Sequence, residues 1–166
     1  MKSKIIVIAS IIALGMAFCA TAYAGKPKDP KKELRFQYDI EYIKNAGDGV
    51  SSIKIFSYGG NKQEAQDRCA ANAVHGVIFK GYSGQGAYQS PLVKSATGYE
   101  DNYDFFNNFF KNGDYGRYAS GIVDGTQQLI KIQGGYKCAA VVNVNVKMLR
   151  KHLEEAGIIK GLASGF

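Results

Sequence analysis

The sequence predicts an α+β domain, in which an antiparallel sheet of about five strands carries two or three helices mainly on one face. Three observations predict this class. Segments near both ends alternate apolar and polar side chains, as half-buried strands do. Other segments repeat apolar residues at helical spacing. The dipeptides Asp124-Gly125 and Gly134-Gly135 are typical of tight antiparallel hairpins. The length of 166 residues, with 46% apolar and 21% charged residues, fits one compact domain and excludes wholesale disorder.

The first 24 residues are expected to be a signal peptide. A basic start is followed by an apolar run over 5–18, and Ala22-Tyr23-Ala24 then forms a small-x-small cleavage site, so the mature chain is predicted to begin at Gly25. The run is of borderline length for a membrane helix and ends in a cleavage pattern. Cys19 leaves an alternative open, a lipid anchor of the bacterial lipoprotein kind. Phe18, however, stands where that pattern prefers a small residue.

Residues 25–33 form a basic leader that contains Pro27 and Pro30, and residues 34–166 form the single predicted domain. The formal net charge of the whole chain is +7. Export argues against nucleic acid as a partner and leaves another envelope protein or an anionic polymer. No later segment is apolar enough to span a membrane, so no transmembrane segment is expected in the mature chain.

Two strands and a helix open the predicted domain. Alternation places Leu34 to Tyr42 in one strand, a turn-rich loop covers 45–49, and a second strand covers 50–58 with Ile53, Ile55 and Ser57 on one face. Asn61 is the expected N-cap of a helix over 62–77, with Glu64 completing a capping box. The expected inward stripe of this helix consists of Cys69, Ala70, Ala73 and Val77.

The middle of the chain is less regular. Residues 79–98 are expected to be mostly loop, with one short strand around Leu92 and a flexible surface loop over 82–86. A helix is expected over 100–111, where phenylalanines recur at helical spacing.

The last third is expected to form a three-strand meander over 117–123, 126–133 and 136–144. In the last strand the core-facing set is Tyr136, Cys138, Ala140, Val142 and Val144. Asn145 is the expected cap of a final helix that buries Leu149 and Leu153. Gly157 should end this helix in a Schellman motif.

Aromatic residues concentrate between Tyr99 and Tyr118. One interpretation is a stacking platform for a ligand or partner, and the other is core packing, which the abundance of Phe favours because Phe has no polar group. The tyrosines that would serve such a surface are Tyr99, Tyr103, Tyr115 and Tyr118.

Cys69 and Cys138 survive the predicted cleavage and both face the expected core. An even cysteine count in an oxidising compartment suggests a disulfide. Ordinary helix-to-sheet packing, however, leaves about 8 Å between Cα atoms where a disulfide allows at most about 6.8 Å. Small residues near both positions could close that gap, so a bridge and two free thiols both stay open.

Catalytic and metal signatures are sparse. His75 is expected on the polar face of the first helix and His152 in the basic last helix, both in solvated structural roles. A nucleophilic pair of Cys69 and His75 fails on geometry, because six helical residues leave the side chains about 120° apart. No cofactor, metal site or catalytic residue is predicted, and enzymatic activity is not expected.

Two segments, 69–81 (CAANAVHGVIFKG) and 135–161, resemble uncharacterised exported proteins of Bacteroides-type Gram-negative bacteria. The order of strand, Ala-rich helix and strand is similar to that of small envelope α+β domains of flagellar-assembly and surface lipoproteins. The resemblance implies an envelope protein and carries no catalytic motif. The sequence therefore predicts an exported, periplasmic or secreted, non-enzymatic binding or assembly module. A small secreted enzyme or ligand carrier that uses region 99–118 is the alternative.

Overall fold

The computed structural model describes residues 36–161. The predicted signal peptide, Cys19, the basic leader and the first residues of the predicted first strand lie outside the described residues. Within 36–161, no helix is long and apolar enough to cross a membrane.

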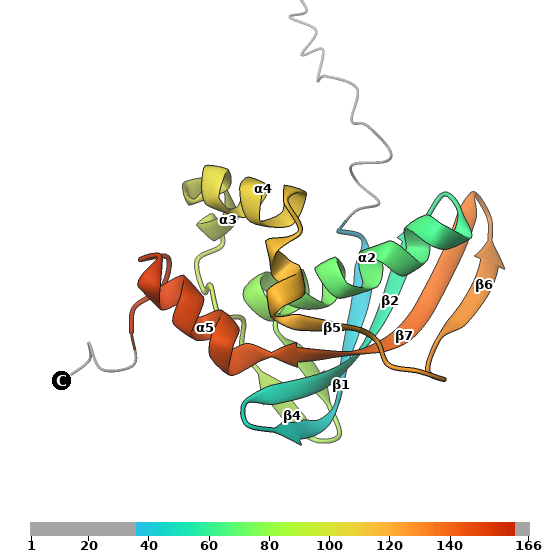
Figure 1. The fold of residues 1–166 in the computed structure, drawn as a ribbon, viewed down its shortest axis with the longest axis horizontal. Helices are drawn as coiled ribbons and strands as arrows, with labels where there is room; N and C mark the ends of the chain where they lie inside the picture. The colour runs from blue at the N-terminus through green and yellow to red at the C-terminus, as the bar shows by residue number, and fades with distance from the viewer. Residues whose placement is uncertain (1–35, 162–166) are drawn as a thin grey trace, which may run out of the picture.

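A five-stranded antiparallel sheet forms the centre of the fold, and helix α2 lies across one of its faces (Figure 1). The strand order is β1-β2-β7, and both β5 and β6 pair with the remaining edge of β7, while β3 and β4 form a separate two-stranded sheet. The predicted α+β class with a five-stranded antiparallel sheet is therefore confirmed. The strands are β1 Tyr38–Gly47, β2 Val50–Gly59, β3 Tyr82–Gly84, β4 Ala87–Gln89, β5 Ala119–Ile122, β6 Gln128–Ile132 and β7 Gly135–Asn145. The helices are α2 Lys62–His75, α3 Gly98–Asp101, α4 Tyr103–Lys111 and α5 Val146–Glu155, with a π-helical turn at Gly76–Lys80 and a 3₁₀ turn at Asp114–Arg117.

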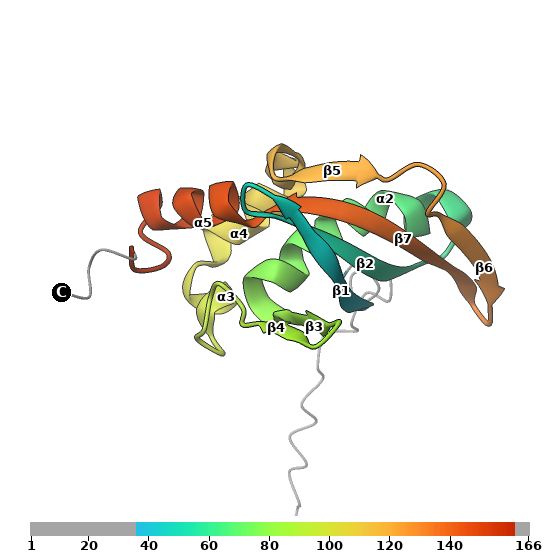
Figure 2. The same cartoon turned by 90° about the horizontal axis from the view of Figure 1, so that it is seen from below.

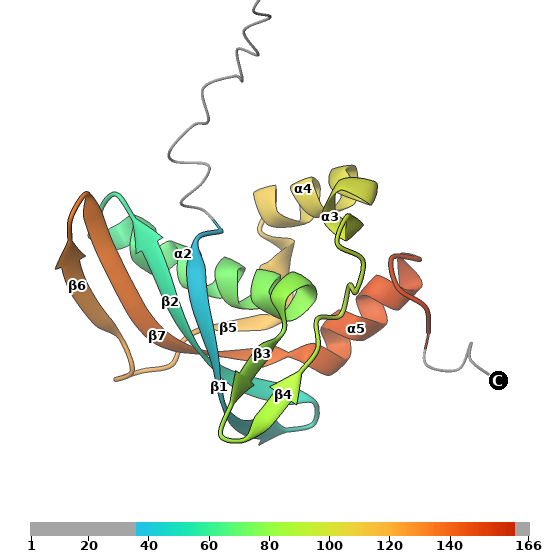
Figure 3. The same cartoon turned by 180° about the vertical axis from the view of Figure 1, so that it is seen from behind.

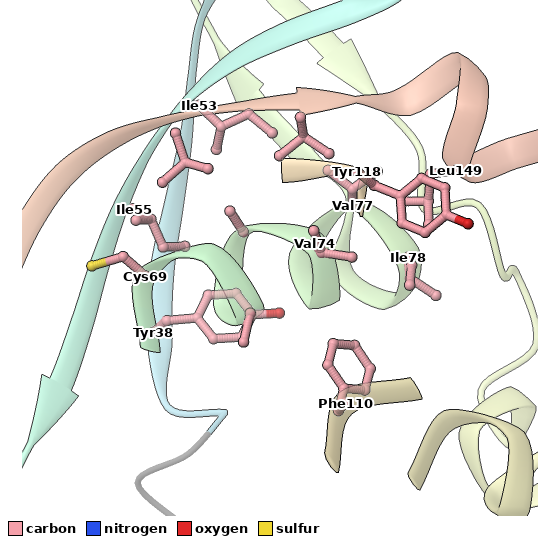
Figure 4. Close-up of a cluster of buried hydrophobic side chains, with 14 of the residues drawn as sticks. Tyr38, Ile53, Ile55, Cys69, Val74, Val77, Ile78, Phe110, Tyr118 and Leu149 are labelled. Atoms are coloured by element: carbon pink, nitrogen blue, oxygen red, sulfur yellow. The ribbon is translucent and has the colours of Figure 1, made fainter. Parts of the chain in front are cut away.

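The core lies between the sheet and α2 (Figure 4). In the register of β2 and β7, Ile53 faces Val142 and Ile55 faces Ala140, and all four are buried. Cys69, Ala73 and Val77 of the predicted helical stripe are buried, while Ala70 is half-buried. The inward sets predicted for β2 and β7 are thus confirmed, with Tyr136 only half-buried at the end of its strand.

Both predicted N-caps are confirmed. The side chain of Asn61 accepts a hydrogen bond from the backbone N–H of Glu64 at 2.9 Å. The side chain of Asn145 accepts one from Met148, also at 2.9 Å. Each cap satisfies a backbone donor that the first helical turn leaves without a partner.

The C-terminal end of α5 is the predicted Schellman motif. Gly157 has a φ of +72°, its N–H donates to the carbonyl of Glu154, and the N–H of Ile158 donates to the carbonyl of Leu153. Leu149 and Leu153 are completely buried, so the predicted inward face of this helix is also confirmed.

The predicted meander is wrong, because β5 and β6 lie end to end along the same edge of β7. Ile122 pairs with Val142, whereas Gln128 pairs with Ala139. At the break between the two strands, the hydroxyl of Thr126 accepts the N–H of Val141 at 3.0 Å and so replaces a strand partner. The Asp124-Gly125 turn therefore joins two short strands that share one long neighbour.

Three tight turns also differ from expectation. Ile132 pairs with Gly135, so the last hairpin turns at Gln133-Gly134, one residue earlier than predicted. The 45–49 loop is mostly strand, because β1 continues to Gly47 and only Asp48-Gly49 form the turn, both at positive φ. Residues 82–86 belong to the hairpin of β3 and β4, whose turn is Gln85-Gly86. Positive φ at both positions of the Asp48-Gly49 and Gln85-Gly86 turns matches the twist of paired strands.

The helix predicted over 62–77 changes to a π-helical turn after His75. No strand forms at Leu92, whose N–H instead donates to the carbonyl of Val77.

The helix predicted over 100–111 is broken into α3 and α4 at Asn102, whose side-chain amide donates to the carbonyl of Gly98. The strand predicted from Arg117 begins at Ala119, because a 3₁₀ turn occupies 114–117.

Candidate functional site

The tyrosines predicted as a ligand or partner surface belong to one aromatic cluster above α2. Tyr99 stacks on Phe106 with ring centroids 5.7 Å apart, and its edge contacts Tyr103. Tyr115 and Tyr118 stack on Phe110 and Phe109. Of the four tyrosines, only Tyr103 is exposed, at 50%, and Tyr118 is buried at 7%. This geometry gives the cluster a packing role, and its use as a partner surface stays a prediction.

The solvated roles expected for His75 and His152 are wrong. The Nδ1 atom of His75 is hydrogen-bonded to the hydroxyl of Tyr38 at 2.8 Å, and its ring stacks on Phe36 at 4.1 Å. His152 packs against Phe109 and Tyr118. Both imidazoles are half-buried among aromatic rings because residues distant in sequence fold over them.

Cys69 and Cys138 are buried free thiols that face each other between α2 and β7. The thiol of Cys69 donates to the carbonyl of Ala65 at 3.4 Å. Burial, reinforced by Cys138, raises the pKa of Cys69 to about 12. A thiol that stays protonated at neutral pH is a weak nucleophile. Because His75 bonds to Tyr38 instead, the structure does not bring Cys69 and His75 together as a catalytic pair.

A second surface, which the sequence analysis missed, is the sheet face opposite α2. Figure 2 shows this face with α2 and α4 behind it. Its side chains lie in rows across the strands, and one row consists of Ile130 on β6, Lys137 on β7 and Tyr58 on β2. The next row contains Phe56, which faces Ala139. We call the surface formed by Lys54, Phe56, Tyr58, Ile130, Ile132 and Lys137 the open face.

Two lysines cover the aromatic rings of the open face. The Nζ of Lys137 lies 4.5 Å from the ring centroid of Phe56 and 5.6 Å from that of Tyr58. The Nζ of Lys54 also lies over the Phe56 ring, 5.2 Å from its centroid. Attraction between the cations and the ring faces holds both ammonium groups over the apolar surface. The open face therefore combines apolar area with fixed positive charge.

Strand β6 forms the outer edge of the open face (Figure 3). Its two isoleucines are exposed, Ile130 at 49% and Ile132 at 36%. Within residues 36–161, the only strand that pairs with β6 is β7, so the other side of β6 is a free sheet edge. Such an edge presents backbone donors and acceptors that another strand can pair with.

A signal for this surface was present in the sequence. The alternation that places Ile53, Ile55 and Ser57 inward must place Phe56 and Tyr58 outward. Aromatic side chains on the solvent side of a strand are therefore the pattern that could have revealed the open face.

Among residues 36–161, no group of three or more His, Cys, Asp and Glu side chains is arranged to hold a metal ion. No family model, curated protein or solved structure matches the chain. The resemblance to exported envelope proteins stays a prediction.

Proposed function

We propose that this chain is an exported binding module of the cell envelope, and that it holds an extended, acidic segment of another envelope protein against strand β6. The observation that carries the proposal is an edge strand with two exposed isoleucines beside a row of lysine and aromatic side chains. The predicted signal peptide supports export.

The strand edge favours an extended partner. A segment that pairs with β6 would form main-chain hydrogen bonds along the edge and place alternate side chains on the open face. Ile130 and Ile132 would lose exposed apolar surface on pairing, which stabilises the complex by about 25 cal/mol for each Å² buried.

Charge favours an acidic segment. Lys131 is on β6 itself, Lys137 is one strand inward with its ammonium over Phe56 and Tyr58, and β2, β6 and β7 contain no Asp or Glu. The acidic side chains that share this face, Asp39 and Glu41, are on β1 at the opposite edge of the sheet. Opposite charges across an interface speed association and exclude partners of the wrong charge.

Site-specific photocrosslinking in cells tests the proposal. A crosslinking amino acid is placed at Ile130 in the full chain, which is expressed with its own predicted signal peptide. A matched one is placed at Tyr88, an exposed aromatic residue of the separate β3–β4 sheet. We expect position 130, but not position 88, to crosslink to an acidic segment of one envelope protein, and Lys137→Glu to weaken that crosslink. Intact mass of the recovered protein, with Gly25 first, tests export.

Three outcomes would refute the proposal. Crosslinks from position 130 to a second copy of this chain would make β6 a self-association edge. Equal crosslinking from positions 130 and 88 would mean that neighbouring proteins reach both positions by random collision and that β6 is not a docking site. A crosslink that is as strong in Lys137→Glu as in the parent protein would mean that positive charge on the open face does not select the partner.

A further inference from the structure

A cavity at the other end of β2 is separate from the open face. It has a volume of about 380 Å³ and is lined by residues of β1, β2 and the turn between them, the β3–β4 hairpin and the start of α5. Figure 3 shows these elements near one another. This volume lies within the range of small-molecule sites. None of the described residues that line it is acidic, and two of them, Lys147 and Arg150, are cationic.

The cationic side of the cavity is held in place by the backbone. The carbonyl of Gly49 accepts hydrogen bonds from the N–H groups of Val146 and Lys147, which ties the β1–β2 turn to the start of α5. Lys147 forms no ion pair within residues 36–161, and the ion pair of Arg150 with Glu154 is long, at 3.8 Å. Both cations therefore keep hydrogen-bond donors for an anion.

The rest of the cavity lining carries neutral polar groups and aromatic rings. The hydroxyls of Ser51 and Tyr82 are hydrogen-bonded to each other at 2.9 Å. The hydroxyl that accepts in this bond can still donate its own proton, and both oxygens can accept further bonds. Tyr42 stacks on Tyr82 with ring centroids 5.8 Å apart. The amide side chain of Gln89 also lines the cavity. Groups that both donate and accept match a ligand rich in hydroxyls.

We infer that this cavity binds a small hydroxylated anion, a sugar acid or sugar phosphate, with its acidic group between Lys147 and Arg150 and its hydroxyls against Ser51, Tyr82 and Gln89. A carboxylate and a phosphate share the chemistry that the two cations recognise. The site uses no residue of the open face, so it does not depend on the proposed docking of a protein segment.

Calorimetric titration of the mature protein at low salt tests this inference with glucuronate, glucose 6-phosphate, glucose and inorganic phosphate. We expect at least one of the two sugar anions to bind, which also distinguishes the carboxylate from the phosphate. Lys147→Gln and Arg150→Gln should each raise Kd about tenfold, the loss of a charge-assisted contact. Lys151→Gln removes an equal charge from an exposed position on the same helix and should leave Kd unchanged. Tyr82→Phe should weaken the sugar anion and not inorganic phosphate.

Several results would overturn the inference. The inference fails if neither sugar anion binds, or if glucose binds as tightly as the sugar anions. It also fails if inorganic phosphate binds as tightly as glucose 6-phosphate, or if Lys151→Gln raises Kd as much as Lys147→Gln does. Because Lys147 is exposed, its substitution should leave the fold intact, which a thermal melt of the same sample verifies.

Discussion

Gly49→Ala perturbs the contact between the β1–β2 turn and α5, and Gly47→Ala is its matched control. Both glycines have left-handed backbones, with φ of +76° at Gly49 and +92° at Gly47. An added Cβ at Gly47 meets no atom within 4 Å, whereas at Gly49 it would lie 2.4 Å from the Cβ of Lys147. The two substitutions therefore share the conformational cost and differ in the steric one.

The expected losses follow from these two costs. Alanine in the left-handed region costs about 1 kcal/mol, so Gly47→Ala should lower the free energy of unfolding by about that amount. Gly49→Ala adds an overlap with a Cβ atom fixed on the first turn of α5, for which about 1–3 kcal/mol more is usual. Its total loss should be about 2–4 kcal/mol.

Urea denaturation of the two variants and the parent protein measures the difference as a shift in midpoint at constant slope. Equal losses for Gly47→Ala and Gly49→Ala would refute the reasoning, because the close approach of the turn to Lys147 would then have no energetic consequence.

Two further predictions concern the core. Leu153→Ala should cost about 2–5 kcal/mol, because Leu153 is completely buried, and an unchanged thermal midpoint would mean that the inward face of α5 is misassigned. Stability should also fall as pH rises above 9.0 toward about 12, because the pKa of Cys69 is raised from 9.0 to about 12, so the unfolded chain releases this proton first. At about 1.4 kcal/mol for each pH unit, this thiol contributes at most about 4 kcal/mol of the loss. Denaturation at a series of pH values measures this loss, which should be smaller in Cys69→Ala than in the parent protein. An equal loss in the variant and the parent, with no free thiols in the denatured parent, would indicate a disulfide instead.

Local features of the fold were predictable because their causes lie within a few residues. An Asn three residues before a helical N–H is enough to form a cap, as at Asn61 and Asn145. Alternation in β7 likewise fixed which side chains face α2. Gly157 could be placed because few other residues tolerate the left-handed position of a Schellman motif.

The rest depended on contacts that sequence spacing does not encode. The end-to-end placement of β5 and β6 along β7 depends on the Thr126 hydroxyl bonding to a backbone N–H 15 residues away. His75 is half-buried because Phe36 and Tyr38, from the start of the described chain, fold against it. The cavity could not be anticipated either, since Ser51, Tyr82 and Arg150 come from three distant elements.

The two proposed sites lie on the same strand and remain physically separable. Ser51 of the cavity and Phe56 of the open face are five residues apart on β2, which is about 17 Å of extended strand. Their side chains also leave opposite faces of the sheet, since odd and even positions alternate. Substitutions at such a separation, with no shared partner, usually act independently. A loss of ligand binding in Arg150→Gln can therefore be assigned to the cavity, and a loss of crosslinking in Lys137→Glu to the open face.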